Sequence, residues 1–321
     1  MKKFLLNLIK SVSKLKFLQG KGLRSNPVFN AFVDFFLTRL IPQDIETLEI
    51  QGSLMVMDLK NKDPSIRRTY QAYAMHRIHE PVTTEIFKKL IKEGNTVIDV
   101  GANIGYFTLL AARLVGHKGK VFSFEPEPRN FAYLTKNLEL NKYKNVVARQ
   151  MAVSDKCGSV DFQICKVDSG HHSVISDTTK SLPKTDIIKV ETVSLDSLFE
   201  KKAKDIDFIK IDAEGSEPKV LAGMKKILLK SKKIKIIMEF YPLLIRQLNQ
   251  SPEKLLEDLL KEYNFSVYII SDDYSAFSKK NLKVSSPSDV MKICHGKKSH
   301  VNLFLEKGNK DFEQNFPVVA L

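Results

Sequence analysis

The sequence lacks the cysteine spacing and the long apolar runs that mark several protein classes. Its three cysteines, Cys157, Cys165 and Cys294, are odd in number and form no CxxC pair. This excludes a zinc ribbon and a disulfide framework and predicts reduced thiols in a cytoplasmic protein. No stretch reaches the roughly 18 consecutive apolar residues of a membrane-spanning helix. The first apolar stretch is interrupted by Asn7 and Lys10, with no small-residue cleavage site after it, so we expect no signal peptide.

Acidic residues are absent from Met1 to Ser25, where seven Lys or Arg residues occur. The 321-residue chain carries a net charge of +14, which suits nucleic acid, an anionic membrane or an acidic substrate, or is simply a basic surface. Within residues 2–18, apolar and basic side chains fall on opposite faces of a helix. This pattern is typical of a helix that associates reversibly with an anionic membrane, or of one that packs on the protein.

The chain divides into an extension and a larger α/β domain. Residues 1–75 are predicted to hold the basic helix, a second helix over 28–40 and a β-hairpin over 47–59. In residues 76–321, strands and helices alternate from residue 96, which predicts βαβ crossovers and a parallel sheet. Residues 153–205 break this alternation and indicate an inserted hairpin that could lie over the ligand-binding edge of the sheet.

The alternation predicts each element by its pattern of apolar residues. The expected strands are 97–100, 120–124, 145–149, 207–211, 234–240, 265–270 and 300–306, and the expected helices are 104–115, 128–140, 217–229 and 252–263. The inserted hairpin is expected to pair residues 159–165 with residues 187–193.

Residues 97–108, VIDVGANIGYFT, form an apolar run that ends in an acid and continues through a glycine turn into an amphipathic helix. This is typical of the first strand, ligand-binding turn and first helix of a nucleotide-type α/β fold. Gly101 and Gly105 let the backbone turn sharply and approach a ligand. The dinucleotide fingerprint GxGxxG is absent, because the spacing runs Gly101, Asn103, Gly105 without a close second glycine.

Acids follow the first, second and fourth strands of the predicted parallel sheet, at Asp99, Glu125 and Asp212. Ligands of such sheets bind beyond the carboxyl ends of the strands, and Glu125 has the spacing of an acid that binds ribose hydroxyls. Asp99 would repel the phosphates of a dinucleotide. S-adenosylmethionine has no phosphate and carries an ammonium and a sulfonium. The charges therefore favour S-adenosylmethionine over NAD.

Four segments occur in order along the chain: DVGANIGYFT, FSFEPEP, MAVSD, and IKIDAEGSE followed by MEFYP. In this order they resemble the FkbM family of S-adenosylmethionine-dependent methyltransferases, over roughly residues 78–306. The resemblance implies a class I, seven-stranded, Rossmann-like methyltransferase fold. It also implies O-methylation of a hydroxyl on a sugar, glycolipid or small natural product.

The resemblance further implies which residues hold the cofactor. The methionine end would lie against Asp99, Gly101, Asn103 and Gly105, the ribose against Glu125, and the adenine against Met151 and Ala152.

Acids also crowd the end of the fourth strand, where Asp212, Glu214 and Glu217 follow Lys210. Crowded carboxyl groups raise one another's pKa, which suits a group that accepts a hydroxyl proton. We place Asp212 near the sulfonium and assign the general base to Glu214 or to a histidine, His172 of the His171-His172 pair. Glu217 could instead simply begin a helix, before Pro218.

Other acids leave alternatives open. Asp212 could join a magnesium site, but no second metal-ligand spacing supports this, so we predict no metal. Glu80 and Glu239 are expected to face the same pocket.

Two other functions compete with this interpretation. FSFEPEPRNFAYLTKNLELNK is similar to the second motif of tRNA guanine methyltransferases. Those enzymes tend to carry Asn-Pro-Pro or Asp-Pro-Pro after the fourth strand, where this chain has Asp212-Ala213-Glu214-Gly215, and no RNA-binding module is visible. A nucleic-acid partner is therefore less favoured. The acids after strands one, two and four argue against a non-catalytic cofactor-binding scaffold.

Overall fold

The structure is a computed structural model, and it describes residues 45–58, 73, 78–165, 173–174, 185–270, 281–294, 300–308 and 310–320. The chain forms two compact units that divide between His79 and Glu80. The predicted boundary at residue 75 stays a prediction. The predicted helices over 2–18 and 28–40 lie outside the described residues. Within the described residues, every helix is too short or too polar to cross a membrane.

The first unit contains the expected β-hairpin. Strand β1 (Ile45–Ile50) pairs antiparallel with β2 (Ser53–Asp58). Gln51 and Gly52 connect them with φ of 52° and 79°. Positive φ at both central residues matches the right-handed twist of the strands, as in the favoured two-residue hairpin turns. The hairpin prediction is confirmed, with boundaries shifted by one or two residues.

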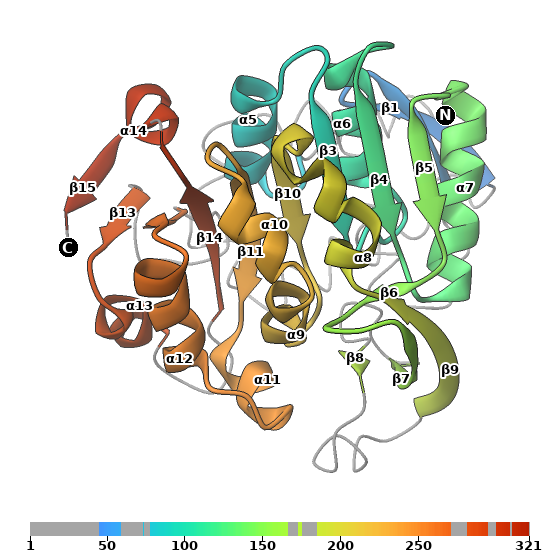
Figure 1. Cartoon of the computed structure of the whole chain (residues 1–321). Coiled ribbons are helices and arrows are strands. Elements are labelled where there is room, and N and C mark those ends of the chain that lie inside the picture. Colours follow the sequence, from blue (N-terminus) through green and yellow to red (C-terminus); the bar gives the residue numbers. More distant parts are fainter. Residues whose placement is uncertain are drawn as a thin grey trace, which may run out of the picture. The chain divides into compact units, whose positions relative to one another are not determined.

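The second unit is built on a mixed sheet with the described strand order β15-β13-β12-β14-β11-β10-β3-β4-β5 (Figure 1). The strands are β3 (Thr96–Val100), β4 (Lys120–Phe124), β5 (Val146–Arg149), β10 (Phe208–Ile211), β11 (Lys235–Phe240), β12 (Ser266–Ile269), β13 (Asn281–Val284), β14 (Val301–Glu306) and β15 (Val318–Ala320). Strands β11, β10, β3, β4 and β5 are parallel, whereas β14 runs antiparallel between β11 and β12.

The class I fold is confirmed by this arrangement. Seven strands, from β12 to β5, form the predicted sheet, and β13 and β15 extend its edge beyond β12. These two short strands, of four and three residues, were not predicted from the sequence.

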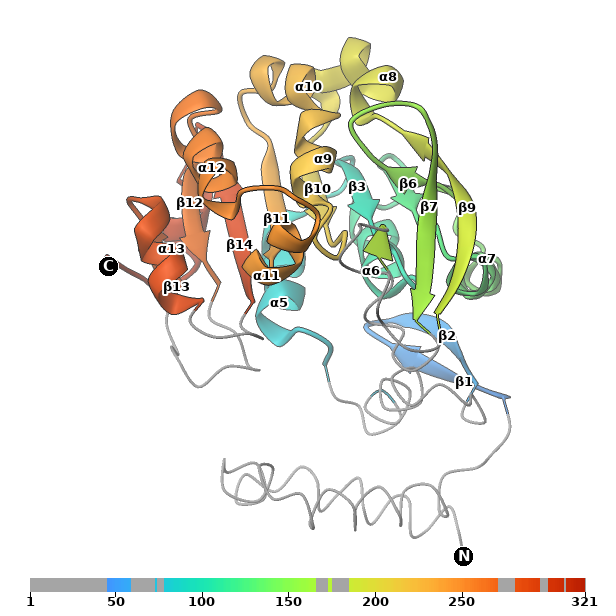
Figure 2. The same cartoon turned by 90° about the horizontal axis from the view of Figure 1, so that it is seen from below.

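Helices cover both faces of the sheet (Figure 1 and Figure 2). One face carries α5 (Pro81–Leu90), α6 (Tyr106–Val115) and α7 (Pro128–Asn141), and the other carries α8 (Leu195–Phe199), α9 (Glu217–Ala222), α10 (Lys225–Lys230), α12 (Pro252–Glu257) and α13 (Pro287–Ile293). The short helices α11 (Pro242–Gln247) and α14 (Asp311–Asn315) follow β11 and β14.

Two helices differ from their predictions. Helix α6 begins at Tyr106, two residues late, because Gly105 adopts a left-handed φ of 99° at its N-cap. The single helix expected over 217–229 is two helices, α9 and α10, which separate at Gly223 and Met224. Glycine weakens a helix, and here it allows contact with a neighbouring backbone, since a Cβ on Gly223 would lie 1.9 Å from the carbonyl oxygen of Ser154.

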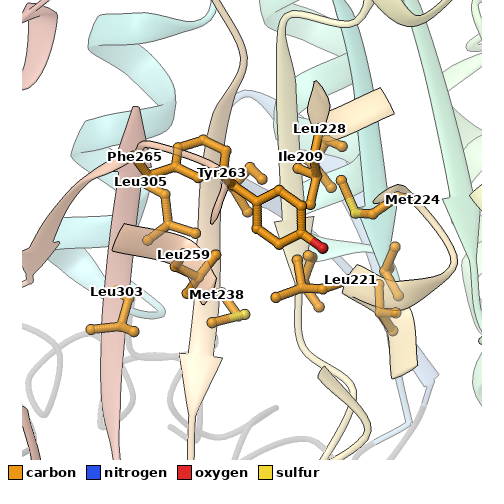
Figure 3. Close-up of a cluster of buried hydrophobic side chains, with 14 of the residues drawn as sticks. Ile209, Leu221, Met224, Leu228, Met238, Leu259, Tyr263, Phe265, Leu303 and Leu305 are labelled. Carbon is orange, nitrogen blue, oxygen red and sulfur yellow. The ribbon is translucent and has the colours of Figure 1, made fainter. Parts of the chain in front are cut away.

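The main core lies between the sheet and α9, α10 and α12 (Figure 3). Leu221, Met224 and Leu228 pack there with residues of the strands below, which include Ile209, Met238, Leu303 and Leu305. On the opposite face the ring of Phe87 lies 4.8 Å from that of Phe107 and 5.0 Å from that of Phe208. Apolar burial on both faces is what holds the parallel strand ends in register.

The insertion is a separate four-stranded sheet. It contains β6 (Ala152–Val153), β7 (Gly158–Cys165), β8 (Ser173–Val174) and β9 (Thr185–Val193). Strands β7 and β9 form the predicted antiparallel pair, from Gly158 opposite Thr192 to Cys165 opposite Thr185. Figure 1 shows this sheet beyond the ends of β4 and β5.

Candidate active site

The candidate site lies where β3, β4 and β10 end at one edge of the sheet. The amide of Asp212 donates to the carbonyl of Val100 at 3.0 Å, and the amide of Gly101 donates to that of Phe124 at 2.9 Å. The turns after the three strands are therefore joined through their backbones. Asp99, Glu125 and Asp212 are brought together as the sequence analysis expected.

Gly101 is needed for this junction. Its φ is 78°, and a Cβ built on it would lie 1.9 Å from the carbonyl oxygen of Asp212. This distance is far below van der Waals contact, so a residue with a Cβ would clash with the Asp212 backbone. Gly101 was predicted to let the backbone turn sharply and approach a ligand. Its positive φ and its close contact with the turn after β10 agree with the first expectation, and the approach to a ligand stays a prediction.

Glu125 ties the first turn to the second strand. Its Oε2 accepts from the amide of Asn103 at 2.8 Å, and its Oε1 accepts from that of Glu127 at 2.9 Å. Burial raises the pKa of Glu125 to about 7, although both backbone bonds favour the ionised form. The side chain of Asn130 also bonds to Glu125. A carboxylate has about four acceptor positions, so one is left to accept from a ligand such as a ribose hydroxyl.

Asp99 lies beneath the same turn and is only 1% exposed. The hydroxyl of Thr108 donates to its Oδ2 at 2.6 Å and also lies 3.0 Å from the hydroxyl of Ser123. Oδ1 has no hydrogen-bond partner among the described residues. Burial raises the pKa of Asp99, while the charge of Lys210 opposes this shift. An orphaned acceptor at this position suits a cationic ligand and disfavours a phosphate, so the site fits S-adenosylmethionine.

Met151 and Ala152 follow β5 at the same edge of the sheet. Met151 is half-buried and packs against the main core. Ala152 begins β6, pairs with Thr192, and is buried with Phe162 and Ile164. Their assignment to the adenine stays a proposal.

Lys210 is a buried cation in the acidic part of the site. Its Nζ lies 2.8 Å from Oδ2 of Asp212 and 4.9 Å from the centre of the Phe107 ring. Burial alone would lower the pKa of Lys210, but the charges of Asp212, Glu80 and Asp99 outweigh it and raise the pKa above its usual range. The lysine therefore stays charged and holds Asp212 in place.

Glu217 organises the loop after β10. Its Oε1 accepts from the amides of Ala213 at 3.0 Å and Gly215 at 3.2 Å. Between these two residues Glu214 adopts a left-handed φ of 48°. Burial raises the pKa of Glu217 to about 7. As the alternative interpretation expected, Glu217 is the first residue of α9, and its side chain supports the loop that presents Glu214.

Glu239 of β11 completes a group of three carboxylates. Oxygens of Asp212, Glu214 and Glu239 all lie within 4.8 Å of one another. Glu239 comes from a neighbouring strand, so the three acids show no metal-ligand spacing in the sequence. Such a set could hold a divalent cation or share protons. Burial raises the pKa of Glu239, and the charges of Asp212 and Glu217 raise it further.

Asn302 of β14 and His300, which directly precedes β14, also reach the site. Neither residue was predicted from the sequence. The side-chain amide of Asn302 donates to Oε2 of Glu80 at 3.2 Å, and Nε2 of His300 lies 3.8 Å from Oε1 of Glu239. Asn302 pairs with Glu239 across the antiparallel strands. The antiparallel pairing of β14 with β11 brings both residues to the site, and local sequence patterns do not reveal that pairing. The predicted base His172 lies outside the described residues, as does His171.

Comparisons with known proteins agree with this geometry. The model of the methyltransferase FkbM domain matches residues 99–267, more than half of the chain. The hexuronic acid methyltransferase AglP of Haloferax volcanii is 29% identical over 139 residues, which cover 43% of this chain and 53% of AglP. The 31-O-demethyl-FK506 methyltransferase FkbM of Streptomyces tacrolimicus is 32% identical over 162 residues, 42% of this chain and 61% of that protein.

The matched region spans little more than half the length of AglP and under two thirds of the Streptomyces protein. Among solved structures, a SAM-dependent methyltransferase from Aquifex aeolicus is similar over 71% of this chain and 90% of its own, with a TM-score of 0.38 and 12% identity. The family match includes the turn after β3, the acids after β4 and β10, and Glu239 within β11. The chain therefore belongs to the FkbM family of S-adenosylmethionine-dependent methyltransferases.

Proposed function

We propose that the chain O-methylates a hydroxyl of a sugar, glycolipid or small natural product. The group of Asp212, Glu214 and Glu239, with oxygens within 4.8 Å of one another beside the cofactor residues, carries the proposal. A hydroxyl is a poor nucleophile until its proton leaves, and a carboxylate within hydrogen-bond reach can accept that proton. The names of the two relatives, a hexuronic acid and a 31-O-demethyl-FK506 methyltransferase, support oxygen-rich acceptors.

The cofactor would be held by the turn after β3 and by the next two strand ends. The proposed contacts are Asp99, Gly101, Asn103 and Gly105 for the methionine end, Glu125 for the ribose, and Met151 with Ala152 for the adenine. When bound, S-adenosylmethionine supplies a methyl group whose bond to sulfur breaks as its bond to the acceptor oxygen forms.

The chain's own residues would divide the remaining work. Asp212, held by Lys210 at 2.8 Å, places a fixed negative charge near the sulfonium. Glu214 or Glu239 accepts the hydroxyl proton on a carboxylate oxygen and later releases it to water. His172 stays a further candidate for this base. Whichever of these residues is the general base would increase the rate roughly 10²–10⁴-fold.

The test follows the methyl group from labelled cofactor into a cell extract. We expect label in the glycan, lipid or small-molecule fraction, resistant to ribonuclease and to mild alkali, because an ether is stable where a methyl ester releases methanol. Glu239→Gln and Glu214→Gln should reduce this labelling, and Glu85→Gln, at an exposed residue of α5, should not. Label that disappears with ribonuclease would support a nucleic-acid substrate, and label released as methanol would support a carboxyl acceptor. Either result would contradict the proposal.

A further inference from the structure

Glu80 has a strained backbone that helix capping does not explain. It adopts φ 39° and ψ 72° directly before Pro81, the first residue of α5. A residue before proline prefers an extended conformation, and left-handed geometry costs a non-glycine residue about 1–2 kcal/mol. The side chain of Glu80 makes no capping hydrogen bond to α5. The strain therefore serves a different placement of the side chain.

That placement is over the acidic end of the sheet. Oε2 of Glu80 accepts from the side-chain amide of Asn302 at 3.2 Å, which connects the start of α5 to β14 across 222 residues of sequence. The charge of Glu80 also acts on Asp99, Lys210 and Glu239, which lie on β3, β10 and β11. Glu80 therefore brings a carboxylate near the charged residues of the site, although it precedes α5 and lies on none of the parallel strands.

Among the acids near the proposed methionine end, Glu80 is well placed to contact a cation from solvent. Asp99 is 1% exposed, and its Oδ2 is bonded to Thr108. Oδ2 of Asp212 is bonded to Lys210. Glu80 is half-buried, and its Oε2 accepts from the neutral amide of Asn302.

We infer that Glu80 binds the α-ammonium group of the cofactor and positions its methionine end. The inference rests on the cofactor site used in the proposed function but not on the choice of methyl acceptor. Glu80 forms a charge-assisted contact above Asp99, and Asn302 orients its carboxylate. The strained turn before α5 is the feature that directs Glu80 to this position.

Calorimetry with two ligands tests this assignment on the unmodified chain and on Glu80→Gln. The ligands are S-adenosylhomocysteine and its analogue with hydrogen in place of the α-amino group. We expect Glu80→Gln to weaken the binding of S-adenosylhomocysteine about tenfold. Binding of the deamino analogue should weaken by less than about twofold, because this ligand has no ammonium group for Glu80 to contact. Glu85→Gln, at a residue 49% exposed on α5, the helix that begins directly after Glu80, is the matched control and should change neither affinity.

Equal weakening of both ligands by Glu80→Gln would mean that Glu80 only supports the fold, and no weakening of either would place it away from the ammonium. Both results overturn the inference. If Glu80→Gln does not fold, Asn302→Leu removes the orienting partner and should weaken S-adenosylhomocysteine selectively. Equal affinity of both ligands in that variant and in the unmodified chain would also overturn the inference. Label found in RNA would refute O-methylation while leaving this result intact.

Discussion

The two halves of the strand edge are built differently. At β3 and β4, carboxylates are bonded to nearby groups: Glu125 accepts two backbone amides, and Asp99 accepts the hydroxyl of Thr108. At β10 and β11, three carboxylates face one another, with Lys210 bonded to Asp212. In the first half the carboxylates are held by hydrogen bonds, which suits a ligand bound in one position, whereas the second half concentrates negative charge that can take up a proton or a cation. Cofactor binding and acceptor chemistry divide along this line in our account.

The largest expected effect comes from breaking the junction between the halves. Gly101→Ala places a Cβ 1.9 Å from the carbonyl of Asp212 at a φ of 78°. We expect a loss of about 3–5 kcal/mol in the free energy of unfolding, measured by chemical denaturation. Gly94→Ala is the control, because Gly94 has φ 86° but no atom within 4 Å of its added Cβ. It should cost only the backbone strain of about 1–2 kcal/mol. Equal losses of stability in the two variants would show that the contact between the added Cβ and the Asp212 carbonyl is relieved without an energetic cost.

The next prediction compares the ion pair of Lys210 in the acidic half with an ordinary surface salt bridge. Lys210→Met removes the buried cation that acts on the half-buried carboxylate of Asp212 and on the buried one of Asp99, and we expect a loss of about 3 kcal/mol in the free energy of unfolding. Lys283→Met removes a half-exposed ion pair with Glu313 and should cost less than about 1 kcal/mol. A Lys210 variant as stable as the Lys283 variant would mean that the acids are not held by this lysine.

A smaller change tests the cofactor half by itself. Thr108→Val removes the hydroxyl that donates to Asp99 at 2.6 Å in a fully buried position. An unsatisfied buried acceptor should cost about 1–2 kcal/mol of stability, measured by denaturation. Thr135→Val, which removes a bond within α7, should cost less than about 0.5 kcal/mol. No difference between the two would argue against a structural role for the Asp99 network.

The pH dependence of cofactor binding should arise partly from Glu125. The ionised carboxylate accepts ribose hydroxyls, and its pKa is raised to about 7 by burial. Below pH 7 the group must lose a proton to bind, so affinity for S-adenosylhomocysteine should fall, approaching about tenfold per pH unit, and should level off above pH 7. Glu125→Gln should remove this component. A variant with the same pH profile as the unmodified chain would exclude Glu125 as its source.

The two halves also differ in how much could be predicted from the sequence. Asp99, Gly101 and Glu125 lie within 27 residues, and their spacing relates directly to the strand–turn–helix pattern. The sheet, the hairpin and the insertion were predicted for the same reason, since periodicity is local. Glu80 and Asn302 are 222 residues apart and meet only because β14 runs antiparallel beside β11. Local sequence patterns do not encode that pairing, so the acids were predicted but their contacts with Asn302 and His300 were not.

The most direct test of this division is the affinity for S-adenosylhomocysteine of two matched variants, Glu125→Gln and Glu239→Gln. If the cofactor binds over β3 and β4, Glu125→Gln should weaken binding by about tenfold or more, and Glu239→Gln should change it by less than about threefold. Glu125→Gln binding as tightly as the unmodified chain, or Glu239→Gln weakening it as much, would contradict the account.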